Sequence, residues 1–271
     1  MSVDVQLVKQ LRDATYASLK DCKTALEENN NDLNAASQWL IKKWASNAAK
    51  KADRELNDGQ VKVTINNGRL TVFKVGCETD FVAKNEMFVQ MLDEVAIILG
   101  SATGKIESID QCDPAIFTQA QETIAQYMAK LGENIQITEI FATDLGDMQA
   151  ATYLHNGGKI AAVVMYRNGT DAADQTAKQV AMQIAAMNPQ YMTIDQIPVS
   201  QVDSKQAEFE AELKAAGKPE AMIIKIAEGK INKYFADLVL MNQLYIGDEG
   251  TTIAHLIDGV FEFVGARRFA V

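Results

Sequence analysis

Charged and aromatic side chains stand together in one short segment of the chain, Thr79-Asp80-Phe81-Val82-Ala83-Lys84-Asn85. The segment follows a strand-like apolar run (70–75) and precedes a helix-like run (87–99). Corners of this kind are usually polar, because irregular backbone must keep its hydrogen-bonding groups satisfied. An aromatic ring held on such a corner is suited to insertion into a partner. Two simpler interpretations stay open: Phe81 folds back into its own core, and Asp80 only caps the next turn.

Cys77 and His155 raise the alternative of a cysteine-dependent enzyme, with a thiol nucleophile and an imidazole base. No base or oxyanion motif adjoins Cys77, and a strand cysteine is usually a small core residue. The wide spacing of Cys22, Cys77 and Cys112 indicates reduced thiols rather than a disulfide framework or a zinc site. The glycines form neither a phosphate-binding loop nor a dinucleotide motif. We therefore predict no catalytic residue, no bound metal and no cofactor.

The overall composition narrows the class of protein. Of the 271 residues, 48% are hydrophobic, which is enough for a sizeable core or two domains, and the formal net charge is -10. Nucleic-acid binding normally needs a basic face, so we expect no direct nucleic-acid partner. No apolar run reaches the length of a membrane span, and residues 1–10 lack the apolar stretch of a signal peptide. We expect a cytoplasmic protein that does not bind membranes.

Helical periodicity predicts three short helices near the N-terminus. Asp32 is placed to cap the third helix, and the charged, alanine-rich stretch 42–58 indicates a helical extension that becomes a linker. Apolar side chains repeat at helical spacing in each helix: Val5, Val8 and Leu11, then Cys22, Ala25 and Leu26, then Leu33, Ala36, Trp39, Leu40 and Ile41.

The central part of the chain contains one pattern twice. Residues 69–99 and 159–187 each run strand, corner and helix, with Thr79-Asp80 at the first corner and Thr170-Asp171 at the second. The second corner continues with two alanines where the first continues with Phe81-Val82. We infer that the fold needs only the Thr-Asp cap, and that the aromatic side chain serves another purpose.

The remaining elements are predicted from turns and periodicity. Asn66-Asn67-Gly68 marks a β-hairpin, Gly132 ends a helix, and Gly217-Lys218-Pro219 separates two helices that form a hairpin. The predicted strands are 60–65, 69–75, 135–141, 243–246 and 261–271, and the predicted helices are 114–131, 202–216, 219–235 and a small one capped by Thr252. In the helix hairpin we expect Phe209, Leu213 and Ala216 to pack on Ile223, Ile226 and Tyr234.

These elements predict an α+β fold with antiparallel sheets. The first part, 1–54, is a three-helix domain with a linker helix. A duplicated core follows, with its N-terminal half at 55–140 and its C-terminal half at 141–198, completed by 236–271. The helix hairpin, 199–235, is an insertion into the second half.

Several segments together resemble the elongation factor Ts family, the exchange factors of the GTPase elongation factor Tu, over essentially the whole chain. The heptapeptide 79–85 resembles the family signature, and residues 15–26 resemble its Thr-Gly-Ala-Gly-Met-Met-Asp-Cys-Lys-Lys-Ala-Leu. Residues 131–135 resemble Ile-Gly-Glu-Asn-Ile, residues 153–160 resemble a motif around His155, and residues 229–235 resemble Gly-Arg-Met-Lys-Lys-Phe. The chain departs from the family at Tyr16, Ser18, Leu19 and Lys20, which puts contacts made by that turn in question.

The resemblance implies a fold and a function. It implies an N-terminal domain of the ubiquitin-associated type and a coiled-coil-like hairpin at 199–235. Thr79, Asp80, Phe81 and Val82 would enter the GTPase domain of elongation factor Tu, displace its Mg²⁺ and release GDP. Further partner contacts would come from Lys23, Leu131, Gly132, His155 and Ile246.

Other interpretations of these contacts stay open. Lys23 would be simply solvated, Leu131 and Gly132 would serve helix packing and capping, and His155 would be merely exposed. The protein would bind elongation factor Tu as a monomer, a homodimer or a 2:2 complex. The alternative function is a protein-interaction or dimerisation module unrelated to nucleotide exchange, with its affinity in the N-terminal helices.

Overall fold

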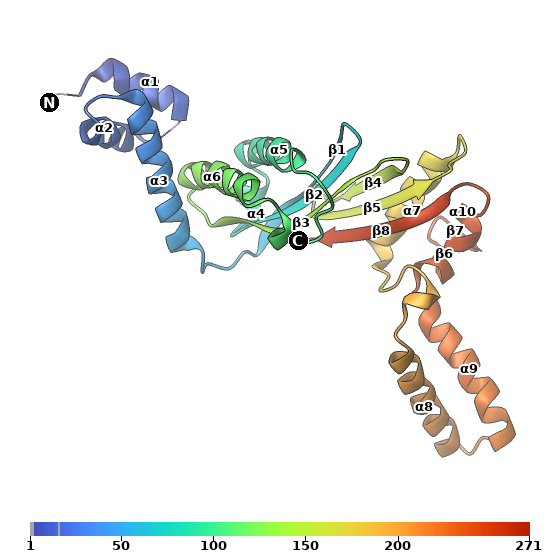
Figure 1. Ribbon diagram of the computed structural model, residues 1–271. Coiled ribbons are helices and arrows are strands. Elements are labelled where there is room, and N and C mark those ends of the chain that lie inside the picture. The colour runs from blue at the N-terminus through green and yellow to red at the C-terminus, as the bar shows by residue number, and fades with distance from the viewer. Residues whose placement is uncertain (1–2, 16) are drawn as a thin grey trace. The chain divides into compact units, whose positions relative to one another are not determined.

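The computed structural model of the protein describes residues 3–15 and 17–271 (Figure 1). Helices and antiparallel strand pairs are both present, which confirms the predicted α+β class. The chain divides into two compact units, one containing residues up to 146 with 156–160 and 269–271, the other containing 147–155 and 161–268. The finer division into four parts stays a prediction.

Three helices open the first unit: α1 (Val5–Thr15), α2 (Leu19–Glu28) and α3 (Leu33–Lys51). Ser18 caps α2 by accepting a hydrogen bond from the Asp21 N–H, and Asp32 caps α3 as predicted. Their shared core is Leu11, Cys22, Ala25, Leu26, Ala36, Leu40 and Trp44. Val5, which shares the helical spacing of Val8 and Leu11, is 80% exposed. Tyr16 lies outside the described residues.

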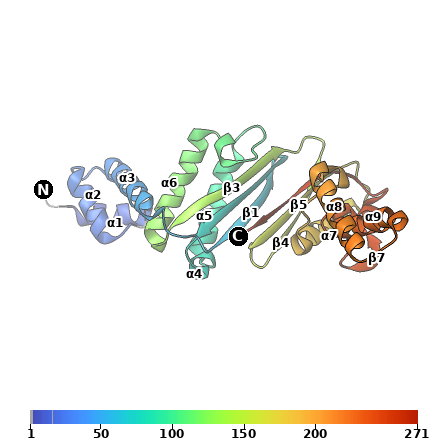
Figure 2. The same ribbon diagram turned by 90° about the horizontal axis from the view of Figure 1, so that it is seen from below.

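A sheet of order β1-β2-β3 follows in the same unit (Figure 2). Strands β1 (Asp58–Asn66) and β2 (Arg69–Cys77) form the predicted antiparallel hairpin. Its turn residues Asn67 and Gly68 have φ of 50° and 74°, the left-handed conformation that Asn-Gly adopts readily. Strand β3 (Ile135–Asp144) pairs antiparallel with β2, so β2 is central and its two ends are fixed on both sides.

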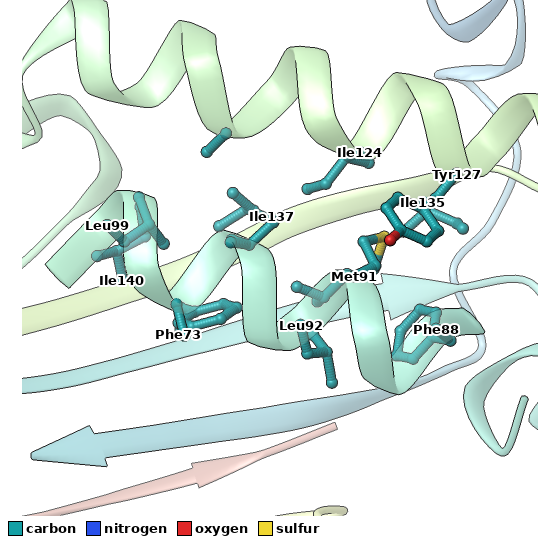
Figure 3. Close-up of a cluster of buried hydrophobic side chains, with 14 of the residues drawn as sticks. Phe73, Phe88, Met91, Leu92, Leu99, Ile124, Tyr127, Ile135, Ile137 and Ile140 are labelled. Atoms are coloured by element: carbon teal, nitrogen blue, oxygen red, sulfur yellow. The ribbon is translucent and has the colours of Figure 1, made fainter. Parts of the chain in front are cut away.

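Two helices, α5 (Glu86–Gly100) and α6 (Pro114–Leu131), cover one face of this sheet. Their buried side chains meet those of β2 and β3 in a continuous core (Figure 3). Phe73 of β2, Met91 and Leu92 of α5, Ile124 of α6 and Ile137 of β3 lie within it. Helix α6 ends at Gly132, which has φ 83° and takes the left-handed cap position predicted for it.

The other large sheet has the order β4-β5-β8, from Gln149–His155, Ile160–Arg167 and Glu262–Ala270. Helix α7 (Ala173–Met187) begins after the second corner. Its N-cap residue is Ala172, and within the described chain no side-chain oxygen caps it. The expectation that Thr170-Asp171 caps this helix was therefore wrong: the corner closes through backbone bonds instead, with the Thr170 N–H donating to the Val260 carbonyl at 2.9 Å.

Helices α8 (Val199–Ala215) and α9 (Glu220–Ala236) lie side by side as the predicted hairpin (Figure 1). Leu213, Ile223 and Ala227 form its buried centre, and the rings of Phe209 and Tyr234 are 6.2 Å apart. Ala216, expected in this packing, is exposed because α8 ends just before it. The small elements are α4 (Asp80–Ala83), η1 (Ile109–Gln111), η2 (Ile194–Gln196), η3 (Leu240–Asn242), β6 (Leu244–Tyr245), β7 (Asp248–Thr252) and α10 (Ile253–Ile257), which Thr252 caps as predicted.

Candidate functional site

The corner after β2 is a single helical turn, α4, which precedes α5 (Figure 2). A side chain caps the start of each of these two helices. The Thr79 hydroxyl accepts the Val82 N–H at 3.4 Å and begins α4. The Asn85 side chain accepts the Met87 N–H at 2.9 Å and begins α5. Thr79 and Asn85 are six residues apart and leave the intervening backbone little freedom, since each fixes an otherwise unpaired N–H group.

Phe81 points away from the protein on this turn. Its side chain is 83% exposed, whereas its neighbours Val82 and Ala83 are buried in the core below. The alternative that Phe81 folds into its own core is therefore excluded. Val82, predicted to act with Phe81, has its side chain in the core, where it anchors the turn, and its contact with a partner stays a prediction.

Asp80 and Lys84 form an ion pair on the outer side of the turn. The Lys84 ammonium donates to the Asp80 carboxylate at 2.7 Å, and this bond lowers the pKa of Asp80 and raises that of Lys84. The Lys84 side chain is largely accessible to solvent, and that of Asp80 is about half accessible. The cap of α4 comes from the Thr79 hydroxyl and not from Asp80, whose carboxylate makes an exposed ion pair of the kind that contributes little to stability.

The turn after α6 binds this corner through a carboxylate that sequence reasoning missed. The Glu133 side chain accepts three hydrogen bonds: from the N–H groups of Glu78 and Thr79 at 3.1 and 3.0 Å, and from the Thr79 hydroxyl at 2.6 Å. Glu133 lies in the segment 131–135 that resembles the family, but the sequence predicts contacts only for Leu131 and Gly132 there.

Glu78, directly after the strand, in turn accepts a hydrogen bond from the turn that contains Glu133. Its carboxylate accepts the Asn134 N–H at 2.6 Å and the Arg54 guanidinium at 3.2 Å, and the Asn134 bond is the main cause of its lowered pKa. Asn134 itself is buried and donates to the Arg54 carbonyl at 2.8 Å. We call the set Glu78, Thr79, Glu133 and Asn134 the carboxylate clamp.

Comparison with known proteins places this chain in a family. The family model described as Elongation factor TS matches residues 78–271. The chain belongs to the elongation factor Ts family. A relative from Brucella anthropi named Elongation factor Ts is 34% identical over 98% of this chain and 89% of its own length. Relatives of the same name from Rhodospirillum rubrum and Ehrlichia ruminantium are 33% and 30% identical, over 97% and 98% of this chain and 88% and 95% of theirs.

Other predicted contact residues in this elongation factor Ts family chain lie elsewhere in the first unit. Gly132 caps α6, and its carbonyl accepts the Lys51 ammonium at 2.7 Å. Leu131 is partly buried against the core. Gly132 thus has a capping role and Leu131 a packing role, and their contact with a partner stays a prediction. Lys23 is exposed on α2, and its Nζ lies 3.7 Å from Oε1 of Glu27.

Two predicted contact residues belong to the second unit. His155 ends β4 with an exposed side chain, and its Nδ1 is 3.1 Å from the Tyr153 hydroxyl. Ile246 is exposed beyond β6, and its N–H donates to the buried side chain of Gln183 at 2.9 Å. The structure thus leaves both side chains accessible to a partner.

Cys77 has the properties of a core residue. It is fully buried, its thiol donates to the Thr79 carbonyl at 3.2 Å, and burial raises its pKa to about 12. A thiol with so high a pKa is a poor nucleophile at neutral pH, which argues against a cysteine-dependent enzyme. Among the described residues, no three His, Cys, Asp or Glu side chains cluster as metal ligands, and no helix there is long and apolar enough to cross a membrane.

Proposed function

We propose that this chain is a guanine-nucleotide exchange factor for elongation factor Tu, without catalytic chemistry of its own. Asp80 and Phe81 enter the GTPase domain near the bound Mg²⁺, displace the metal and release GDP. The observation that carries the proposal is the exposure of Phe81 on a turn that is capped at both ends and anchored by buried neighbours. Membership of the elongation factor Ts family supports the choice of partner.

The chemistry of Mg²⁺ explains why a small displacement of its ligands weakens nucleotide binding. Mg²⁺ demands near-ideal octahedral geometry and bridges phosphate oxygens, so a displaced ligand weakens both metal and nucleotide binding. By linkage, a factor that lowers the affinity for GDP must itself bind less tightly when GDP is bound. The factor therefore leaves once a new nucleotide enters.

One ring cannot supply the whole effect. Burial of a Phe side chain contributes about 2–3 kcal/mol, whereas accelerating release by about four decades needs about 5.5 kcal/mol. The remaining free energy must come from other contacts with the partner. Of the predicted contact residues, Lys23, His155 and Ile246 suit this role because they are exposed. Leu131 and Gly132 belong to the turn that supports the corner. Residues of each unit therefore contribute contacts to the proposed interaction.

The finer fold belongs to the same proposal. Residues 1–54 form a domain of the ubiquitin-associated type, and the core, 55–140 and 141–198 with 236–271, is a duplication that carries the hairpin 199–235. Two Ile-Asp-Gln turns support the duplication. In η1 the Gln111 side chain accepts the Glu107 N–H at 2.8 Å, and in η2 the Gln196 side chain accepts the Met192 N–H at 2.7 Å. A helix follows each turn, with proline as the first residue of α6 and as the N-cap residue of α8.

The test is stopped-flow release of a fluorescent GDP analogue from purified elongation factor Tu. Adding the chain should accelerate release in a saturable manner, with excess Mg²⁺ slowing the accelerated phase. Release that is unchanged at saturating chain would refute the proposal and leave an interaction module as the better interpretation. The proposed site of action is the cytoplasm, and the stoichiometry, whether monomer, homodimer or 2:2 complex, would follow from the mass of the complex.

A further inference from the structure

We propose that Glu133 is a positioning residue for Phe81. Through the carboxylate clamp it fixes the corner, so that the ring keeps its outward direction when it is pressed into a partner. This inference rests on the proposed function, because it concerns the same ring. It adds a residue that touches neither the partner nor the nucleotide.

The clamp satisfies backbone groups that no regular element serves. Strand β2 ends at Cys77 and helix α4 begins at Asp80, so the N–H groups of Glu78 and Thr79 need acceptors from elsewhere. Glu133 provides one carboxylate for both, at 3.1 and 3.0 Å, and takes the Thr79 hydroxyl as well at 2.6 Å. Hydrogen bonds to an ionised acceptor are the stronger kind, so this corner is held more firmly than a neutral turn would be.

The second corner shows that the fold itself does not require such a clamp. There the cap residue of α7 is Ala172, and the turn closes through backbone bonds, from Thr170 to Val260 and from Ala173 to Thr170, both at 2.9 Å. That corner carries no exposed aromatic residue in the described chain. The carboxylate clamp therefore accompanies the exposed ring and not the strand-to-helix turn as such.

The clamp is in turn held from α3 and the residues after it. Arg54 donates to the Glu78 carboxylate, and Lys51 donates to the Gly132 carbonyl beside Glu133. The buried Val82 and Ala83 hold the other side of α4. Together these contacts fix α4 at both ends, so a force on the exposed ring reaches the sheet instead of tilting one turn of helix.

The experiment compares Glu133→Gln with Glu122→Gln, a control that removes an exposed carboxylate from α6. GDP release from elongation factor Tu is measured over a range of factor concentrations. Glu133→Gln should lower the maximum release rate about tenfold, because the amide cannot accept from all three donors. The half-saturating concentration should change less than about twofold, since most of the affinity arises elsewhere. Glu122→Gln should change neither quantity.

Two further measurements separate positioning from a general loss of structure. The amide hydrogens of Glu78 and Thr79 should exchange faster in Glu133→Gln, while those of β1 and α5 exchange as before. The double variant Phe81→Ala with Glu133→Gln should release GDP no more slowly than Phe81→Ala alone, because a positioning residue has nothing to position once the ring is gone.

Each outcome decides between the two proposals. If Phe81→Ala slows release and Glu133→Gln does not, the positioning role is overturned and the exchange function stands. If Phe81→Ala has no effect, both are overturned. A Glu133→Gln protein that changes only the half-saturating concentration would make Glu133 a docking contact, contrary to this inference. Should Glu133→Gln not fold, Glu78→Gln carries the same test from the other side, and an unchanged maximum rate would overturn the proposal.

Discussion

The hydroxyl of Thr79 donates to the carboxylate of Glu133 at 2.6 Å, and the same oxygen accepts the Val82 N–H at 3.4 Å. The Thr79 side chain thus binds Glu133, which lies 54 residues away in sequence, and also caps α4, the helix that carries Phe81. Because both bonds use one oxygen, the direction of the ring is tied to the turn after α6. We therefore expect the corner to keep its position relative to the sheet, unlike a surface loop.

Phe81→Ala should slow GDP release without loosening the fold. The ring is 83% exposed, so its removal costs the free protein almost no packing, while the complex loses about 2–3 kcal/mol of burial. The expected fall in the maximum release rate is one to two decades. Ile97→Ala is the matched control, because Ile97 is a similarly exposed apolar residue on α5. Stopped-flow GDP release and thermal melting of the unmodified chain and the two variants check this prediction. Equal release rates for the two variants would contradict it.

Thr79→Val should destabilise the first unit, whereas Thr170→Val should not. The first change removes a helix cap and a bond to a carboxylate, which together are worth about 1–3 kcal/mol. Thr170 uses only its backbone at the equivalent corner, so its change should stay within about 0.5 kcal/mol. Urea unfolding followed by circular dichroism measures both. Similar losses at the two corners would show that the side-chain cap matters little.

Local signals in the sequence predicted much of this architecture. Asn67-Gly68 located the hairpin, Gly132 the end of α6, and the glycine and proline after residue 216 the helix hairpin, because each acts through its own backbone geometry. The strand-corner-helix pattern also located the cap at Thr79, but it did not predict α4 as a helical turn separate from α5.

What the sequence did not predict depends on distant partners. Glu78 and Glu133 look like ordinary surface acids in sequence, and their role appears only when the turn after α6 meets the end of β2. Likewise, Thr170-Asp171 has the same residues as Thr79-Asp80, yet its cap does not form because a neighbouring backbone supplies the bonds. The type of a side chain determines which groups it can bind, and the packing of the folded chain determines whether such a group lies within reach.

The Cys77 thiol should make the protein less stable at high pH. Burial raises its pKa from 9.0 to about 12, so above pH 9 the unfolded chain loses this proton before the folded protein does. The free energy of unfolding therefore falls as pH rises from 9 toward 12, and this group contributes no pH dependence below 9. At pH 10.5 the loss is on the order of 2 kcal/mol.

Cys77→Ala isolates this contribution. Urea unfolding at pH 7.5 and pH 10.5 should show a smaller drop in stability for the variant than for the unmodified chain, because groups other than Cys77 titrate equally in both. Cys112→Ala, another buried thiol with a raised pKa, controls for the loss of a buried sulfur. Identical pH slopes for Cys77→Ala and the unmodified chain would show that the buried thiol ionises as freely as an exposed one.

Two glycine-to-alanine changes should have opposite effects. Gly59 has φ 153°, and a Cβ there would lie 2.1 Å from the Val75 carbonyl oxygen in the adjacent strand. Backbone must move to admit it, so Gly59→Ala should destabilise by about 2 kcal/mol or more. Gly229 lies inside α9 with open space around its Cβ position. Gly229→Ala should stabilise by about 0.5–1 kcal/mol, because alanine loses less backbone entropy in a helix. Calorimetry of both variants measures the shifts in melting temperature, and a destabilised Gly229→Ala would mean that α9 needs its glycine for close approach to another surface.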